Sequence, residues 1–273
     1  MMQIDEKKSY LELFKNLNLK SDDVIFISSD ISKMASSCRS YDERLDINKI
    51  IETLQEILVD GSIIVPSYTD NLLDSDTFNW RKSKANTGAF SNKVMRRKDF
   101  IRTNDPLHSV LVWGKGQEEV CALKDESTFG KNSIFNFLRL KNAKFLFIDI
   151  HIQKCFTYIH FIEEQLLVHY RKPYHYNIKC IYPEKEEVRR IHFYSKKLGV
   201  SSDINDLHAI LLKNNCYQSV SHRGCQIDLL EAQTVWDYAT KCINNGPYLY
   251  KFSLVKYFKD FIKRYILRRK GIF

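Results

Sequence analysis

No stretch of this sequence holds the roughly 18 uninterrupted apolar residues that a membrane-spanning helix needs. The opening segment, MMQIDEKKSY, is charged and polar, so it also lacks the apolar stretch of a secretory signal. The seven cysteines lie far apart and form no C-x-x-C pair, which argues against a zinc site, a redox motif or a disulfide framework. We therefore expect a cytoplasmic protein whose thiols act mostly as small hydrophobic groups, and we predict no metal site.

A basic stripe across the body of the protein is also missing, although the formal net charge is +9. Residues 251–273 carry eight Lys or Arg and one Asp, so most of the excess positive charge lies in this tail. Proteins that bind nucleic acid more often interleave basic and aromatic residues over the folded domain. We therefore expect no nucleic-acid partner.

What the sequence does contain is enough apolar material for a large core, since 44% of its 273 residues are hydrophobic and 13% are aromatic. Helix-like and strand-like patterns alternate, which is typical of an α/β domain, and the first strand, helix and strand favour a sheet with a parallel centre. The patterns predict helices over residues 5–18, 47–59, 133–140, 157–170, 204–214 and 226–244. They predict strands over residues 24–27, 62–66, 109–113 and 145–149, β-type alternation over 175–195, and polar irregular segments over 28–40 and 70–107.

We interpret residues 1–250 as one domain, in which 171–200 form a β-rich lobe over the site, and residues 251–273 as a basic amphipathic C-terminal helix. Leu254, Phe258, Phe261 and Tyr265 recur at helical spacing in this tail. The opposite side of the predicted helix holds Lys256, Lys259, Lys263 and Arg264. Such a helix either packs on the domain with its basic face in solvent or lies on an anionic membrane surface.

Ligands of open α/β sheets usually bind where strands end and loops turn into helices, and residues 28–38 and 149–163 are two such places. The first holds hydroxyls, backbone N–H groups and a lysine, which suit the amide arm and phosphates of an extended cofactor. It contains no glycine, so it is neither a P-loop nor a dinucleotide fingerprint, and an ordinary polar loop is the alternative. Its residues are Ser28, Ser29, Asp30, Ile31, Ser32, Lys33 and Met34.

The second place holds a His-x-x-Glu pattern. If Thr157 caps a helix, His160 lies in its first turn and shares a face with Glu163, so the two side chains can pair. The helix start disfavours the imidazolium and the carboxylate favours it, which suits a base that titrates near neutrality. A surface His–Glu pair is the alternative, and Glu164 is a second candidate partner.

Two other chemistries compete at this segment. Cys155 stands just before the helix, where a thiol could act as a covalent nucleophile, but no signature supports that role. His151, His160 and His169 recur every nine residues, which turns successive side chains to opposite faces of a helix and argues against a shared metal ion.

Taken in order, several segments from about residue 22 to residue 245 resemble the aminoglycoside 3-N-acetyltransferase family, also called antibiotic N-acetyltransferases. The segments that carry the resemblance are Val24 to Met34, Gly61 to Thr69, Thr87 to Phe90, Arg102 to Ser109 with Gly114, Phe129 to Ser133, and Thr157-x-x-His160-x-x-Glu163. The chain departs from the family pattern at Asp30, Asp105, Ile134 and Ile148-Asp149.

The resemblance implies a layered fold with a central mixed sheet flanked by helices, distinct from the GNAT fold. It implies acetyl-CoA or another acyl-CoA as cosubstrate, direct transfer to an amine, His160 as general base and Glu163 as its orienting partner. Cofactor contacts are expected from residues 28–34 and Ser109. Contacts to the acceptor are expected from Tyr68, Asp105 and Thr157.

Three hypotheses follow for the function. The acceptor is an amino sugar of surface-polysaccharide assembly, which the basic tail favours through peripheral contact with the inner face of a membrane, or it is an aminoglycoside antibiotic. The third hypothesis is an inactive relative that serves as a binding protein. An aminoglycoside is a polycation and requires a carboxylate-lined pocket. The acidic candidates are Asp70, Asp74, Asp76, Asp105 and Asp149. A homo-oligomer is compatible with the sequence.

Overall fold

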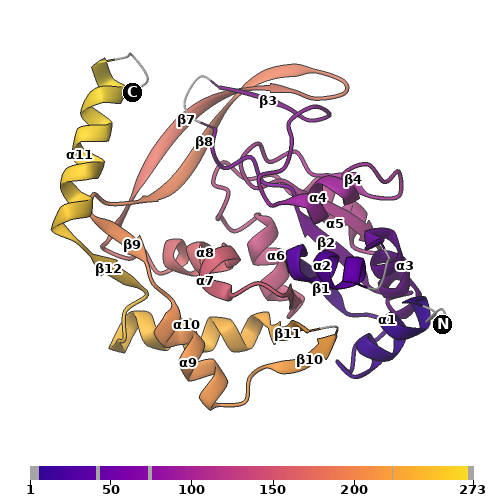
Figure 1. Cartoon of the computed structure of the whole chain (residues 1–273). Coiled ribbons are helices and arrows are strands. Elements are labelled where there is room, and N and C mark those ends of the chain that lie inside the picture. Colours follow the sequence, from indigo (N-terminus) through magenta and orange to yellow (C-terminus); the bar gives the residue numbers. More distant parts are fainter. Residues whose placement is uncertain (1–5, 41–43, 73–75, 223, 270–273) are drawn as a thin grey trace.

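A seven-stranded mixed sheet forms the centre of the protein in a computed structural model that describes residues 6–40, 44–72, 76–222 and 224–269 (Figure 1). The strand order is β10-β11-β6-β1-β2-β5-β4. β1 runs parallel to both β2 and β6, whereas the pairs β2–β5, β4–β5, β6–β11 and β10–β11 are antiparallel. The strands are β1 (Val24–Ser29), β2 (Ser62–Pro66), β4 (Ile101–Arg102), β5 (Val110–Gly114), β6 (Lys144–Ile148), β10 (Gln218–His222) and β11 (Cys225–Glu231).

Helices cover both faces of this sheet because its central strands are apolar on both sides. On β1, Phe26 packs into one buried cluster while Ile25 and Ile27 pack into the other, as the two-residue repeat of a strand requires. The Phe26 side is covered by α5 (Gln117–Ala122), α6 (Ile134–Leu140), α7 (Ile152–Cys155), α8 (Tyr158–Gln165), α9 (Asn205–Lys213) and α10 (Ala232–Asn245). The opposite side is covered by α1 (Glu6–Lys15), α2 (Ser32–Ser40), α3 (Ile47–Ile57) and α4 (Ala89–Val94).

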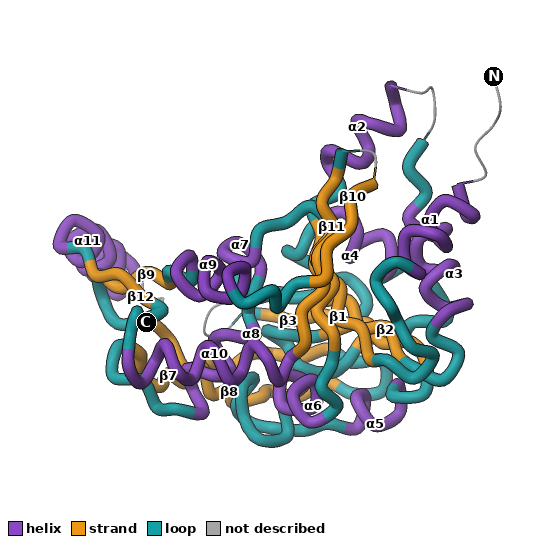
Figure 2. The backbone as a smooth tube through the Cα atoms, turned by 90° about the horizontal axis from the view of Figure 1, so that it is seen from below, coloured by secondary structure: helices purple, strands orange, loops and turns teal. Residues whose placement is uncertain are grey.

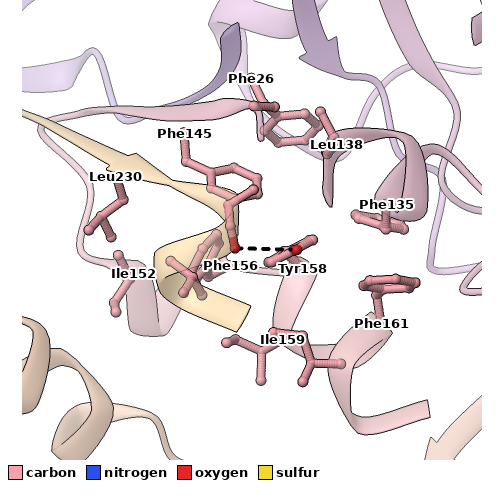
Figure 3. Close-up of a cluster of buried hydrophobic side chains, with 14 of the residues drawn as sticks. Phe26, Phe135, Leu138, Phe145, Ile152, Phe156, Tyr158, Ile159, Phe161 and Leu230 are labelled. Atoms are coloured by element: carbon pink, nitrogen blue, oxygen red, sulfur yellow. Dashed lines mark hydrogen bonds between the residues drawn. The ribbon is translucent and has the colours of Figure 1, made fainter. Parts of the chain in front are cut away.

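Packing of α8 against the sheet decides which of its side chains face the site. Tyr158, Ile159 and Phe161 are at most 1% exposed and join an aromatic cluster with Phe145 and Phe156 (Figure 3). The Tyr158 hydroxyl donates a hydrogen bond to the backbone oxygen of Ala232 at the start of α10. These contacts fix the rotation of α8 and thereby the direction of its polar residues.

Two smaller sheets extend the molecule. The long hairpin of β7 (Arg171–Ile181) and β8 (Glu186–Lys196) pairs with β3 (Thr77–Asn79), and β9 (Val200–Ser202) pairs with β12 (Tyr250–Phe252). The helix α11 (Leu254–Arg269) follows β12 at the edge of the molecule, as both views show (Figures 1 and 2).

The structure confirms the mixed α/β class and corrects four of the sequence expectations. Residues 32–40 form α2 rather than a loop, and residues 225–231 form β11 rather than the start of a helix. The helix expected over 157–170 ends at Gln165, and the irregular segment 70–107 includes β3, α4 and β4. The division into residues 1–250 and 251–273 stays a prediction.

Candidate active site

A cavity of about 460 Å³ opens beyond the carboxyl end of β1, where the switch-point argument places a ligand. Its walls come from four separate parts of the chain, the last of which spans residues 150–157. They are residues 28–32, Pro66 with Tyr68 and Asp70, residues 86–89, and Ile150 with Lys154, Cys155 and Thr157.

Most of the predicted cofactor segment reaches this cavity. Ser28, Ser29, Asp30, Ile31 and Ser32 line it, and the Asp30 carboxylate accepts hydrogen bonds from the backbone N–H and hydroxyl of Ser32 at the start of α2. These two hydrogen bonds lower the pKa of Asp30, so the carboxylate is ionised at neutral pH.

Three other predicted cofactor residues lie elsewhere. The Lys33 ammonium is 3.0 Å from Oδ1 of Asp149, beside a neighbouring pocket, and Met34 is 1% exposed in the core. The Ser109 hydroxyl is fully buried, where it donates to the backbone oxygen of Ser67 and accepts from Nε of Arg102. Met34 and Ser109 are thus buried in the interior, and neither lines the cavity.

The predicted acceptor residues are also divided. Tyr68 and Thr157 line the cavity, and burial raises the pKa of Tyr68 well above its ordinary value, so its phenol is protonated at neutral pH. Asp105 lies in a separate small pocket, where its carboxylate accepts from the backbone N–H groups of Leu107 and His108. Thr157 occupies the N-cap position of α8 but makes no side-chain capping hydrogen bond, because its own backbone is already helical.

His160 and Glu163 meet on α8 as their spacing predicts. Nδ1 of His160 lies 2.9 Å from Oε2 of Glu163, and the backbone N–H of His160 donates to the backbone oxygen of Thr157 in the cavity wall. The imidazole is 26% exposed, whereas the carboxylate is fully buried. The histidine is therefore the accessible member of the pair.

Glu163 also has two partners that the sequence analysis missed. Nη2 of Arg171 lies 2.6 Å from Oε2 of Glu163 and 2.6 Å from Nδ1 of His160, and the Tyr170 hydroxyl donates to Oε1 of Glu163 at 2.9 Å. The Arg171 guanidinium is 1% exposed, so the ion pair is buried. The only sequence signal was a basic residue shortly after the His-x-x-Glu pattern, and its use depends on the chain reversing between α8 and β7.

These contacts set the charge of both members of the pair. Burial, followed by the Arg171 charge, lowers the pKa of His160 to about 4, although Glu163 opposes the shift. Burial alone would raise the pKa of Glu163, but its contacts with His160, Arg171 and Tyr170 outweigh burial and lower it. The expectation that His160 titrates near neutrality is therefore wrong: the ring is neutral at pH 7 and its lone pair is available, but the low pKa makes it a weaker base than an ordinary imidazole.

The competing candidates at this segment have other surroundings. Glu164 points away from His160 and accepts a hydrogen bond from the Ser127 hydroxyl, so helix phase selects Glu163 as the partner. Burial raises the pKa of Cys155 to about 12, which leaves its thiol protonated and a poor nucleophile. Among the described residues no group of three or more His, Cys, Asp or Glu side chains is placed to hold a metal ion.

Comparison with known proteins assigns the chain first to a class and then to a family. The class is that of the CoA-dependent acetyltransferases. Residues 29–244 match the family model described as aminoglycoside 3-N-acetyltransferase, so the chain belongs to that family and is an acyl-CoA-dependent N-acetyltransferase. No curated protein matched the sequence.

Solved structures share the fold at low sequence identity. YokD from Bacillus subtilis has a TM-score of 0.71 and 17% identity, covering 88% of this chain and 99% of its own. AAC-IIIb in binary complex with CoASH has a TM-score of 0.70 and 15% identity, covering 85% and 93%. A mutant of AAC(3)-IVa in complex with apramycin has a TM-score of 0.69 and 17% identity, covering 90% and 95%. The expected fold is thus confirmed.

Proposed function

We propose that this enzyme transfers an acyl group directly from acyl-CoA to an amine of an amino sugar, with His160 as general base. The observation that carries the proposal is the neutral, accessible imidazole of His160 held by the buried carboxylate of Glu163, 2.9 Å away. A thioester is already activated, so the protein has to align the two substrates and remove one proton from the attacking amine.

The tautomer of His160 decides whether the ring can do this. If Nδ1 carries the proton, it donates to Glu163 and leaves the lone pair of Nε2 free to accept a proton from the amine. If Nδ1 instead accepts from Arg171, the proton sits on Nε2, and that nitrogen cannot act as a base. The carboxylate of Glu163 favours the first tautomer, and Arg171 and Tyr170 hold this carboxylate in place.

The cosubstrate is proposed to lie along residues 28–32, with Tyr68 and Thr157 near the acceptor. This placement is supported by the shared lining of one cavity and by the single turn of α8 between Thr157 and His160. Lys154, also in the cavity wall, supplies a positive charge that suits a phosphate of CoA.

The charge of the cavity favours an amino sugar over an aminoglycoside as the acceptor. Two of its lining residues are acidic, Asp30 and Asp70, and one is basic, Lys154. Of the other acidic candidates, Asp105 and Asp149 lie in different pockets, Asp76 lines neither those pockets nor the cavity, and Asp74 lies outside the described residues. A polycation would be held more firmly by several convergent carboxylates, whereas a singly charged amine needs fewer.

Amino sugars carried on nucleotides or lipids receive N-acyl groups during surface-polysaccharide assembly, and we propose this setting for the enzyme. It corresponds to a cytoplasmic protein with peripheral contact at the inner face of a membrane. The second candidate acceptor is an aminoglycoside, which is supported by family membership and by the apramycin bound to a structural neighbour.

The test is thiol release from acetyl-CoA with nucleotide-linked amino sugars and aminoglycosides as acceptors, using His160→Ala as control. Turnover of amino sugars that the substitution abolishes would support the proposal. Turnover confined to aminoglycosides would show that the acceptor is an aminoglycoside and would leave the proposed mechanism unchanged. No turnover with either class, and with longer acyl-CoAs, would indicate an inactive relative that binds ligands.

A further inference from the structure

The C-terminal helix α11 faces the body of the protein with its polar side. Oδ2 of Asp260 accepts a hydrogen bond from the backbone N–H of Gly199 at 3.1 Å, and Nζ of Lys256 lies 2.8 Å from the same carboxylate. Gly199 has a φ of +78°, and a Cβ there would lie 2.9 Å from Cβ of Tyr257. Only a glycine allows this close approach, so the body-facing side of α11 is specified by the sequence.

The apolar side of α11 consequently faces outward. An amphipathic helix that packs on its domain buries its apolar side instead, so the first of the two alternatives for this helix does not hold. Neither view shows another labelled element on the outer side of α11 (Figures 1 and 2). The outward apolar residues, which are 47–67% exposed, are Leu254, Val255, Phe258, Phe261, Ile262, Tyr265 and Ile266.

Exposed apolar surface of this extent marks an interaction site, and its charged border indicates the partner. Lys259 and Lys263 line a shallow groove on α11 with Ile262 and Ile266, so positive charge borders the apolar face. A second copy of the helix packed on this face would bring lysines toward lysines. An anionic lipid surface satisfies both features, because headgroups attract the lysines and the acyl boundary takes up the apolar side chains. The side chain of Arg264 lies outside the described residues.

We propose that α11 is a membrane-docking helix that lies in the plane of an anionic bilayer surface with Phe258 and Phe261 inserted. This role is separate from acyl transfer, since none of these residues lines the cavity beyond β1 or hydrogen-bonds His160 or Glu163. Docking would hold the enzyme at a lipid surface without a membrane-spanning segment. No described helix has the length and hydropathy needed to span a bilayer.

The experiment is flotation of the full-length protein with vesicles of phosphatidylcholine alone or mixed with phosphatidylglycerol. The proposal expects binding to the anionic vesicles, weaker binding at high salt, and little binding to neutral vesicles. Phe258→Glu/Phe261→Glu should abolish binding, and Lys259→Gln and Lys263→Gln should each weaken it about fivefold. Leu140→Glu is the matched control, because Leu140 is 74% exposed on α6 and away from α11.

Circular dichroism and thiol release from acetyl-CoA check that each variant is folded. Vesicle binding that is unaffected by the phenylalanine substitutions would overturn the proposal. Absence of binding to anionic vesicles would also overturn it. If light scattering then showed a dimer that Phe258→Glu dissociates, α11 would instead be an interface between copies of the chain.

Discussion

Glu163→Gln should separate the orienting role of the carboxylate from its contribution to packing, since the two side chains have nearly the same shape. The substitution removes the counter-charge of the Arg171 guanidinium, which is 1% exposed. Breaking a buried ion pair by changing one partner costs about 3–5 kcal/mol of folding free energy. The glutamine amide can also donate to Nδ1 of His160, which places the ring proton on Nε2 and removes the base.

We therefore expect kcat to fall about 10²–10⁴-fold, the usual contribution of a general base, with little change in KM for acetyl-CoA. The assay is thiol release on protein that is shown to be folded by urea titration. Glu164→Gln is the matched control, since Glu164 is the next residue, is buried and bonds Ser127 instead of His160. Activity within about twofold of wild type in Glu163→Gln would refute the orienting role. An equal loss in both variants would assign the effect to folding.

Three further outcomes are expected. The pKa of His160 is about 4 in the folded protein and 6.5 when unperturbed, so between these pH values the unfolded chain binds a proton that the folded protein does not. The free energy of unfolding should therefore fall as the pH decreases through this window. Urea titrations at about pH 7 and about pH 5 should show this fall in the wild type and a shallower fall in His160→Gln. Cys155→Ala should retain turnover, and iodoacetamide should not inactivate the wild type at neutral pH, because the Cys155 thiol has a pKa of about 12. If iodoacetamide inactivated the wild type but not Cys155→Ala, Cys155 would again be a candidate nucleophile. Tyr170→Phe should lower the free energy of unfolding by about 1 kcal/mol and reduce kcat less than Glu163→Gln, since it removes one of several donors to the carboxylate; an unchanged urea midpoint would show that this hydrogen bond adds nothing.

The central strands could be predicted from the sequence because each is a short apolar run whose character is set locally. β11 could not, since Ile227 and Leu229 form a strand only through antiparallel pairing with β6. The helix α2 was missed because its serines are weak helix formers, although Met34 and Cys38, four residues apart, are both buried on one face.

For the site, as for the fold, contacts within one helix could be predicted from the sequence and contacts between elements could not. The spacing of His160 and Glu163 is a property of one helix and could be read directly. Arg171 could not be placed, because its contact with Glu163 depends on where α8 ends and β7 begins. Periodicity likewise gave the two faces of α11, but only the contact between Gly199 and Asp260 determines which of them turns inward.

The four residues that surround the proposed proton transfer, His160, Glu163, Tyr170 and Arg171, all lie between positions 160 and 171, whereas most of the cavity wall comes from residues 28–32, 66–70 and 86–89. The residues proposed for proton transfer thus occupy one short stretch of the sequence, and most of the residues that shape the acceptor pocket lie in other segments. Substitutions in residues 66–70 or 86–89 could therefore exchange one amine substrate for another during evolution, or in the laboratory, without disturbing the base. A library confined to those two loops is the natural starting point for altering acceptor preference.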